Sequence, residues 1–208
     1  MKLNYKTTMS LVAAMGCLAM SANAAVVSIN IDNHDFEVGS GTNVSSWDQD
    51  NTNGGSGVNT ASPLPDGKAL WINFTGVASQ TTGTPIVEGT TYTLTVDLGQ
   101  QTSWAADGGI IRLYGSDDLS LALAEFDTGN LPAGGDTLLN QTTSFVATAG
   151  QANGQFIGVA LIGGASSGGT QVSFDNVRLD ATAAAIPESS TTALLGLGGL
   201  ALILRRRK

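Results

Sequence analysis

The sequence has 208 residues, of which 17 are acidic and nine are basic. The charge is uneven, because residues 25–186 hold 16 acidic side chains but only three basic ones, Lys68, Arg112 and Arg178, a net charge of −13. Nucleic-acid phosphates are bound through Lys and Arg, so this part of the chain is not expected to bind DNA or RNA. Cys17, the one cysteine, precedes it, which excludes disulfides, a thiolate nucleophile and a cysteine zinc site there.

Residues 1–24 have the order of parts that is typical of a secretory signal peptide. Lys2 and Lys6 give a positive start, residues 9–20 are apolar, and Ala22-Asn23-Ala24 supplies a small-x-small cleavage site. About a dozen apolar residues are too few for a helix that spans a membrane, which needs roughly 20. We therefore expect an N-terminal signal helix that is removed on export.

Residues 25–183 read as a single all-β domain. The run 91–98 alternates strictly between polar and apolar residues, and other short runs show similar patterns. The remaining expected strands are 26–31, 69–74, 110–114, 120–126, 143–147, 156–162 and 171–179. Glycine-rich spacers such as 51–57 separate them. The pattern predicts an antiparallel two-sheet sandwich, and we expect a jelly roll. The apolar spacing slips at Asp175-Asn176, which indicates a β-bulge.

Residues 184–208 end the chain in three parts. A motif in residues 186–190 contains Pro187 and Glu188, an apolar stretch occupies 191–204, and the last four residues are basic. Those four are Arg205, Arg206, Arg207 and Lys208. A helix over 191–204 would be roughly 21 Å long, against a bilayer core of about 30 Å. We expect a short membrane helix whose basic end stays in the cytoplasm, with the domain outside.

This C-terminal pattern, IPESSTTALLGLGGLALILRRRK, closely resembles the PEP-CTERM sorting signal of Gram-negative bacteria that make extracellular polysaccharide. The resemblance implies that an exosortase-type membrane protease reads the signal. It also implies membrane association followed by a place at the cell surface or in the extracellular matrix. Ser189 stands where the motif has its second Pro, so whether the signal is cut in this chain stays open.

Catalytic motifs are scarce in the sequence. His34 is the only histidine, which leaves no parts for a Ser-His-Asp or Cys-His system, and no phosphate loop or dinucleotide fingerprint occurs. A glycan hydrolase would need only two carboxylates, but nothing in the sequence selects a pair. We therefore expect a non-enzymatic protein, with an exported glycan hydrolase as the weakest alternative.

The ends of the expected domain loosely resemble the opening and closing strands of galactose-binding-like jelly rolls, which include many carbohydrate-binding modules. The residues concerned are Phe36-Glu37 and Ser173-Phe174-Asp175-Asn176-Val177-Arg178-Leu179. In that family a Glu and an Asp at these positions meet on a calcium ion. The resemblance therefore implies a structural calcium ion bound by Glu37 and Asp175.

Exposed aromatic rings are the groups on which sugars stack in such modules. Trp47 and Trp104 lie in polar, turn-rich surroundings, and Tyr114 is a further candidate. Trp71 can be either such a platform or a residue of a second packed face, and core packing is the alternative for every one of these rings. We expect an exported envelope or matrix protein that contacts extracellular polysaccharide. The alternative is a purely structural surface protein without a defined ligand.

Overall fold

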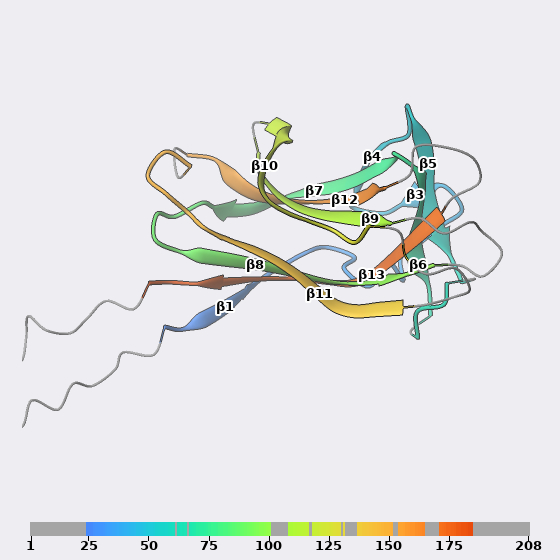
Figure 1. Cartoon of the computed structure of the whole chain (residues 1–208), viewed down its shortest axis with the longest axis horizontal. Helices are drawn as coiled ribbons and strands as arrows, with labels where there is room; N and C mark the ends of the chain where they lie inside the picture. Colours follow the sequence, from blue (N-terminus) through green and yellow to red (C-terminus); the bar gives the residue numbers. More distant parts are fainter. Residues whose placement is uncertain are drawn as a thin grey trace, which may run out of the picture. The chain divides into compact units, whose positions relative to one another are not determined.

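The computed structural model describes residues 24–60, 62–65, 67–100, 108–116, 118–129, 131, 137–151, 154–164 and 171–184. Every regular secondary-structure element in these ranges is a β-strand (Figure 1). Residues 1–23 of the expected signal peptide lie outside the described residues, as does the expected sorting signal from residue 185 on. Within the described ranges, a search for an apolar helix long enough to cross a membrane finds none.

One of the two large sheets has the strand order β11-β8-β13-β6-β5, with β1 paired to the C-terminal half of β13, and we call it the first sheet. Its neighbouring strands are all antiparallel. Its strands are β1 (Val26–Ile29), β5 (Gly54–Asn59), β6 (Ala69–Phe74), β8 (Thr91–Gly99), β11 (Thr137–Val146) and β13 (Gln171–Thr182). Strand β13 therefore lies inside the sheet, between β8 and β6.

The second sheet has the order β10-β9-β12-β7-β4 and is also antiparallel throughout. Its strands are β4 (Asp48–Asp50), β7 (Val77–Pro85), β9 (Gly109–Gly115), β10 (Asp118–Asp127) and β12 (Phe156–Gly163). A small hairpin joins β2 (Gly39–Ser40) to β3 (Asn43–Val44). In Figure 1, β7, β9 and β12 form a layer beside the layer of β8, β13 and β11.

The core fills the space between the two sheets. Strand β8 turns Leu94, Val96 and Leu98 inward, and all three are fully buried, as its alternating sequence predicts. From the opposite sheet, Gly109 faces the side chains of Leu98 and Phe174. The prediction of an all-β antiparallel sandwich is confirmed, and its curled sheets are consistent with a jelly roll. The two expected terminal helices fall on residues outside the described ranges.

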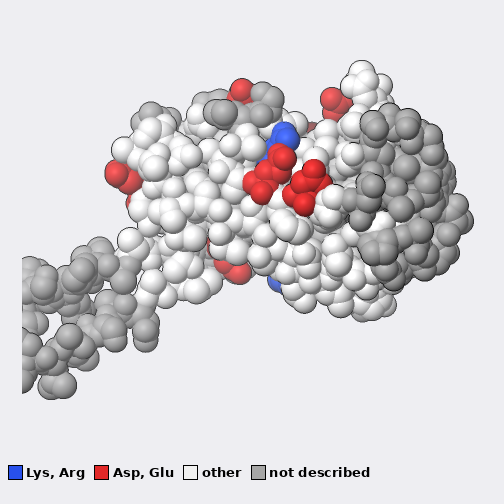
Figure 2. Space-filling view, in the orientation of Figure 1, with Lys and Arg blue, Asp and Glu red and all other residues white. Residues whose placement is uncertain are grey.

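Charged groups are sparse on the surface of the domain. Figure 2 shows small groups of Asp and Glu side chains on one face, with few Lys or Arg atoms between them. One of the three cations, Arg112, is neutralised by Glu125, with 2.6 Å between Nη2 and Oε2. The acidic composition therefore appears as a dispersed negative surface, which favours solubility.

The close approach of the sheets at Gly109 predicts a steric effect. A methyl group there would lie 2.8 Å from both Leu98 Cδ2 and Phe174 Cζ, so Gly109→Ala should destabilise the domain by about 1–3 kcal/mol. Gly83→Ala is the matched control, because no atom lies within 4 Å of a methyl group there. Thermal denaturation should separate the two variants, and equal melting temperatures would contradict this packing.

Candidate functional site

Trp47 belongs to the core of the domain. Its side chain is only 6% exposed, and its Nε1–H group donates to the carbonyl oxygens of Asp32 and Asn33 at 3.1 and 3.3 Å. The ring packs against Phe36, with 5.2 Å between the ring centroids. The expectation that Trp47 offers an exposed face to a ligand is therefore wrong.

Tyr114 is also unsuited to stacking. It is 4% exposed, and its ring covers Gly158 so closely that a methyl group there would lie 2.3 Å from Tyr114 Cζ. Its hydroxyl group shares a hydrogen bond of 2.9 Å with Thr81 Oγ1. The expected role of Tyr114 in ligand binding is thus corrected, and Trp104 lies outside the described residues.

A polar patch occupies the face of the first sheet that points away from the core, which we call the outer face. Strands β6 and β13 turn Leu70, Ile72, Val172 and Phe174 inward, so the residues between these point outward. The outward residues are Trp71, Asn73, Gln171, Ser173 and Asp175. The last three are buried although they lie outside the apolar core. These covered polar side chains set the outer face apart from an ordinary solvated sheet face.

The middle of the outer face is shaped by small residues. Gly57, Trp71, Ser173 and Gly99 stand in one row across β5, β6, β13 and β8. The Trp71 ring leans over Gly57, where a methyl group would come within 2.7 Å of it. At the other end of the row, a methyl group at Gly99 would lie 2.8 Å from Cγ of Pro63. The row, which we call the floor, is therefore bordered by an indole ring at one end and by the segment that contains Pro63 at the other.

Two buried carboxyl groups stand in the next row. Asp97 on β8 is directly opposite Asp175 on β13, and the two side chains are 7% and 1% exposed. Residues that face each other in this way have Cβ atoms about 4.5–5.5 Å apart and point to the same side of the sheet. The fold thus places two carboxyl groups side by side on the outer face, where they are shielded from water.

Two β-bulges hold this pair. The register of β8 slips against β11 between Leu138 and Gln141, and against β13 between Asp175 and Arg178. Each bulge contains an Asn in the left-handed conformation, Asn140 with φ 55° and Asn176 with φ 51°. The bulge predicted at Asp175-Asn176 is therefore confirmed, and a second one lies on the other side of β8.

Both asparagines donate to the same carboxylate. The backbone N–H of Asn140 donates to Asp97 Oδ1 at 2.6 Å, and Asn176 Nδ2 donates to Asp97 Oδ2 at 3.1 Å. The backbone N–H of Asn176 donates to Asp175 Oδ1 at 2.7 Å. Arg178 extends the network, because its guanidinium group donates to Asn140 Oδ1. Asn176 therefore contacts both carboxyl groups and fixes one relative to the other.

The two residues expected to bind calcium are engaged with protein groups. Glu37 is exposed, and its Oε1 accepts from the backbone N–H of Lys68 at 2.8 Å, whereas Asp175 is buried beside Asn176. In the part of the chain that the structure describes, no group of three or more His, Cys, Asp or Glu residues is arranged to hold a metal ion. Calcium thus gains no support from the described residues.

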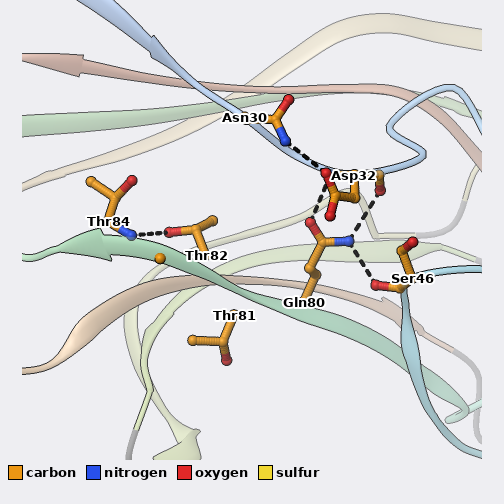
Figure 3. A pocket seen from close by; sticks show the side chains of 8 residues that line it. Asn30, Asp32, Ser46, Gln80, Thr81, Thr82 and Thr84 are labelled. Carbon is orange, nitrogen blue, oxygen red and sulfur yellow. Dashed lines mark hydrogen bonds between the residues drawn. The ribbon is translucent and has the colours of Figure 1, made fainter.

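A separate pocket of about 460 Å³ lies between the start of the domain and β7 (Figure 3). Its polar lining is bound mainly to itself: Gln80 Nε2 donates to the carbonyl oxygens of Asp32 and Ser46, and Gln80 Oε1 accepts from Asp32 N–H. Among the described residues that line it, Asp32 is the single carboxylate. The outer face, with its opposed pair, is therefore the better candidate for chemistry.

Solved structures with a similar fold include several cyclases. A cyclase from Fischerella sp. TAU is 24% identical, with a TM-score of 0.63 over 77% of this chain and 99% of that chain. The Stig cyclase Fisc from Fischerella sp. TAU is 23% identical, with a TM-score of 0.63 over 77% of this chain and 100% of that chain. Its structure holds (3Z)-3-(1-methyl-2-pyrrolidinylidene)-3H-indole, and a further Fischerella sp. TAU cyclase structure holds 4-(1H-indol-3-yl)butan-2-one. No curated protein matches this chain.

The family model that matches is HpiC1-like, described as HpiC1 cyclase, and it covers residues 27–180. These residues include nearly all of the sandwich and both members of the pair, Asp97 and Asp175. The match overturns the expectation of a non-enzymatic envelope protein, and with it the polysaccharide-binding and purely structural functions. The body of this chain belongs to the HpiC1-like cyclase family.

Proposed function

We propose that this protein is a cyclase that closes a ring in a small aromatic molecule on the outer face of the first sheet. The observation that carries the proposal is the opposed, buried pair Asp97 and Asp175. Membership of a cyclase family supports the reaction type. The pair supplies what such a reaction needs, which is a group that donates and recovers a proton in a place shielded from water.

The chemistry follows from the position of the pair. Two carboxyl groups directly opposite each other can divide the roles of proton donor and proton acceptor between them. We assign the donating role to Asp175, the more deeply buried of the two, and the accepting role to Asp97, which receives two hydrogen bonds from asparagines.

The reaction balances without an oxidant or reductant. Asp175 donates its proton to a carbon–carbon double bond of the substrate, which leaves a carbocation. A nucleophilic ring carbon attacks this cation and forms the new carbon–carbon bond. The proton on that ring carbon then leaves, restores aromaticity and returns to the carboxyl pair. The product is an isomer of the substrate, and the pair ends in its starting state.

The substrate class comes from the floor beside the pair. Trp71 offers a half-buried indole ring beside Ser173, in the row next to the pair. Aromatic rings stack on one another with a gain of about 0.5–1.5 kcal/mol beyond the area buried. The indole compounds in the structures of the Fischerella cyclases point to the same class. An indole with an unsaturated side chain is therefore the substrate class we propose.

The place of action is proposed from the chain ends. The signal peptide of residues 1–24 would export the protein. The PEP-CTERM-like segment 184–208 would deliver it, through an exosortase-type protease, to the envelope or beyond. An enzyme so placed would act outside the cytoplasm.

Trp71 should contribute to binding of an aromatic ligand. We expect 4-(1H-indol-3-yl)butan-2-one to bind the wild-type protein, and Trp71→Ala to raise its Kd by roughly 3- to 10-fold through loss of stacking. Trp71→Phe keeps an aromatic ring and should retain most of the affinity. Isothermal titration calorimetry measures both. Equal affinity of the wild type and Trp71→Ala would place the ligand elsewhere.

Asp175 should be needed for turnover. With an alkenyl-substituted indole as substrate, Asp175→Asn should lower the rate of formation of a ring-closed isomer by about 100-fold or more, because the proton donor is lost. Mass spectrometry after chromatography detects a product of unchanged mass. Unimpaired turnover by Asp175→Asn would reject the role of this residue.

Asn176 should orient the pair. Glycine adopts the left-handed conformation freely, so Asn176→Gly keeps the bulge and its N–H group but removes the amide that binds Asp97. We expect turnover to fall roughly 10-fold, which is about the effect of one hydrogen bond of 1.4 kcal/mol. Asn176→Ala adds backbone strain of about 1–2 kcal/mol, visible in thermal denaturation. If glycine and alanine variants melt alike, the bulge is not held as described.

A further inference from the structure

The loop that leads from β1 to β2 is attached to the start of β6 by a reciprocal pair of contacts, which we call the Glu37–Lys68 clasp. The loop is closed internally by Asn33, whose Oδ1 accepts from Val38 N–H and whose Nδ2 donates to Val38 O, at 2.9 and 2.8 Å. From this closed loop, Glu37 reaches Lys68, and Lys68 reaches back. The clasp joins two segments that are distant in sequence.

One half of the clasp is an ammonium group on backbone carbonyls. Lys68 Nζ donates to the carbonyl oxygen of Glu37 at 2.9 Å and to that of Gly39 at 3.2 Å. Lys68 is the one lysine of residues 25–186, and its side chain is half-buried. Backbone carbonyls grouped around a positive charge are the ligands that hard metal ions also use. The carbonyl groups of the loop therefore bind a positive charge, which is the ammonium group of Lys68.

The other half of the clasp seats the Glu37 carboxylate. Its Oε1 accepts from Lys68 N–H at 2.8 Å, and it lies so close to Gly67 that a methyl group there would be 2.1 Å from Oε1. Gly67 has φ +59°, a conformation that glycine adopts at little cost. Glycine at this position thus provides both the turn and the space that the carboxylate needs.

These contacts conflict with a calcium ion bound by Glu37. Calcium requires six to eight oxygen ligands at about 2.3–2.6 Å, but Glu37 Oε1 and the carbonyl oxygens of Glu37 and Gly39 are already bound to Lys68. We infer that the ammonium group of Lys68 supplies the positive charge of this loop in place of the divalent cation that the sequence resemblance implies. With the clasp formed, Glu37 holds the loop without a calcium ion.

The clasp also supports the proposed site through the backbone. Lys68 directly precedes β6, the strand of Trp71, and His34 O accepts from Val177 N–H at 2.9 Å, next to the bulge of Asn176. The loop is thus tied at one end to β6 and at the other to β13. This inference does not rest on the proposed reaction, because its contacts and its test concern stability alone.

The test uses thermal denaturation of the full chain. The melting temperature of the wild type should agree within about 1 °C in excess calcium chloride and in excess EDTA, because the clasp leaves no calcium ion at Glu37 to be removed. Lys68→Met keeps the length of the stem but removes the ammonium group, and it should lower the melting temperature by about 3–8 °C. Lys68→Arg retains a cation and should melt at a temperature between those of the wild type and Lys68→Met. If Lys68→Met fails to fold, folding of Lys68→Arg still shows that a cation is needed at this position.

Glu37→Gln is the matched control that separates the two kinds of cation. A glutamine oxygen still accepts the Lys68 N–H, so the clasp predicts nearly wild-type melting, whereas loss of a calcium ligand would destabilise the protein as EDTA does. A rise of more than about 3 °C when calcium is added to the wild type would overturn the inference. Equal melting of Lys68→Met and the wild type would overturn it as well.

Discussion

Strand β13 places neighbouring side chains in opposite environments, and both the core and the candidate site depend on this alternation. Phe174 points into the core and is fully buried, whereas Asp175, the next residue, points to the outer face and is buried there too. A strand inside a sheet can do this only if its apolar face is well packed, because the buried carboxyl group costs free energy. The sandwich core thus supplies the stability that allows a shielded carboxyl pair to exist on its outer surface.

The sequence was sufficient to predict most of the sheets but not their glycine-rich and polar members. The alternating run 91–98 is β8 almost to the residue, and the phase slip at Asp175-Asn176 is a bulge. Residues 51–57 are predicted as a spacer, yet most of β5 lies there. The glycines suggest a turn in the sequence, but Gly57 is a strand residue that leaves space for the Trp71 ring. Strand β7 is missed for a related reason, since its polar residues lack apolar alternation.

The candidate site could be predicted only in part, because its residues meet through register. Asp97 is one polar residue in a regular strand, and nothing near it in the sequence indicates that it faces Asp175. The tryptophans show the same limit: Trp47 has polar neighbours but is buried against Phe36, and Trp71 lies within an apolar run but points to the outer face. The sequence of one strand shows which of its residues share a face. Only the pairing of strands shows which residues from different strands meet on that face.

The expectation of a non-enzymatic protein was wrong because the sequence has one histidine and does not show which carboxyl groups the fold pairs. A hydrolase of the Ser-His-Asp kind needs an imidazole, but proton transfer to a substrate needs only a carboxyl group in the right state. In the proposed site this group is Asp175, which is buried and lies opposite Asp97, and both features are properties of the fold. The two bulges then fix the geometry, because Asn140 and Asn176 approach Asp97 from the strands on either side of β8. In such a site the rigid sheet orients the acid, and few side chains of recognisable chemistry are required.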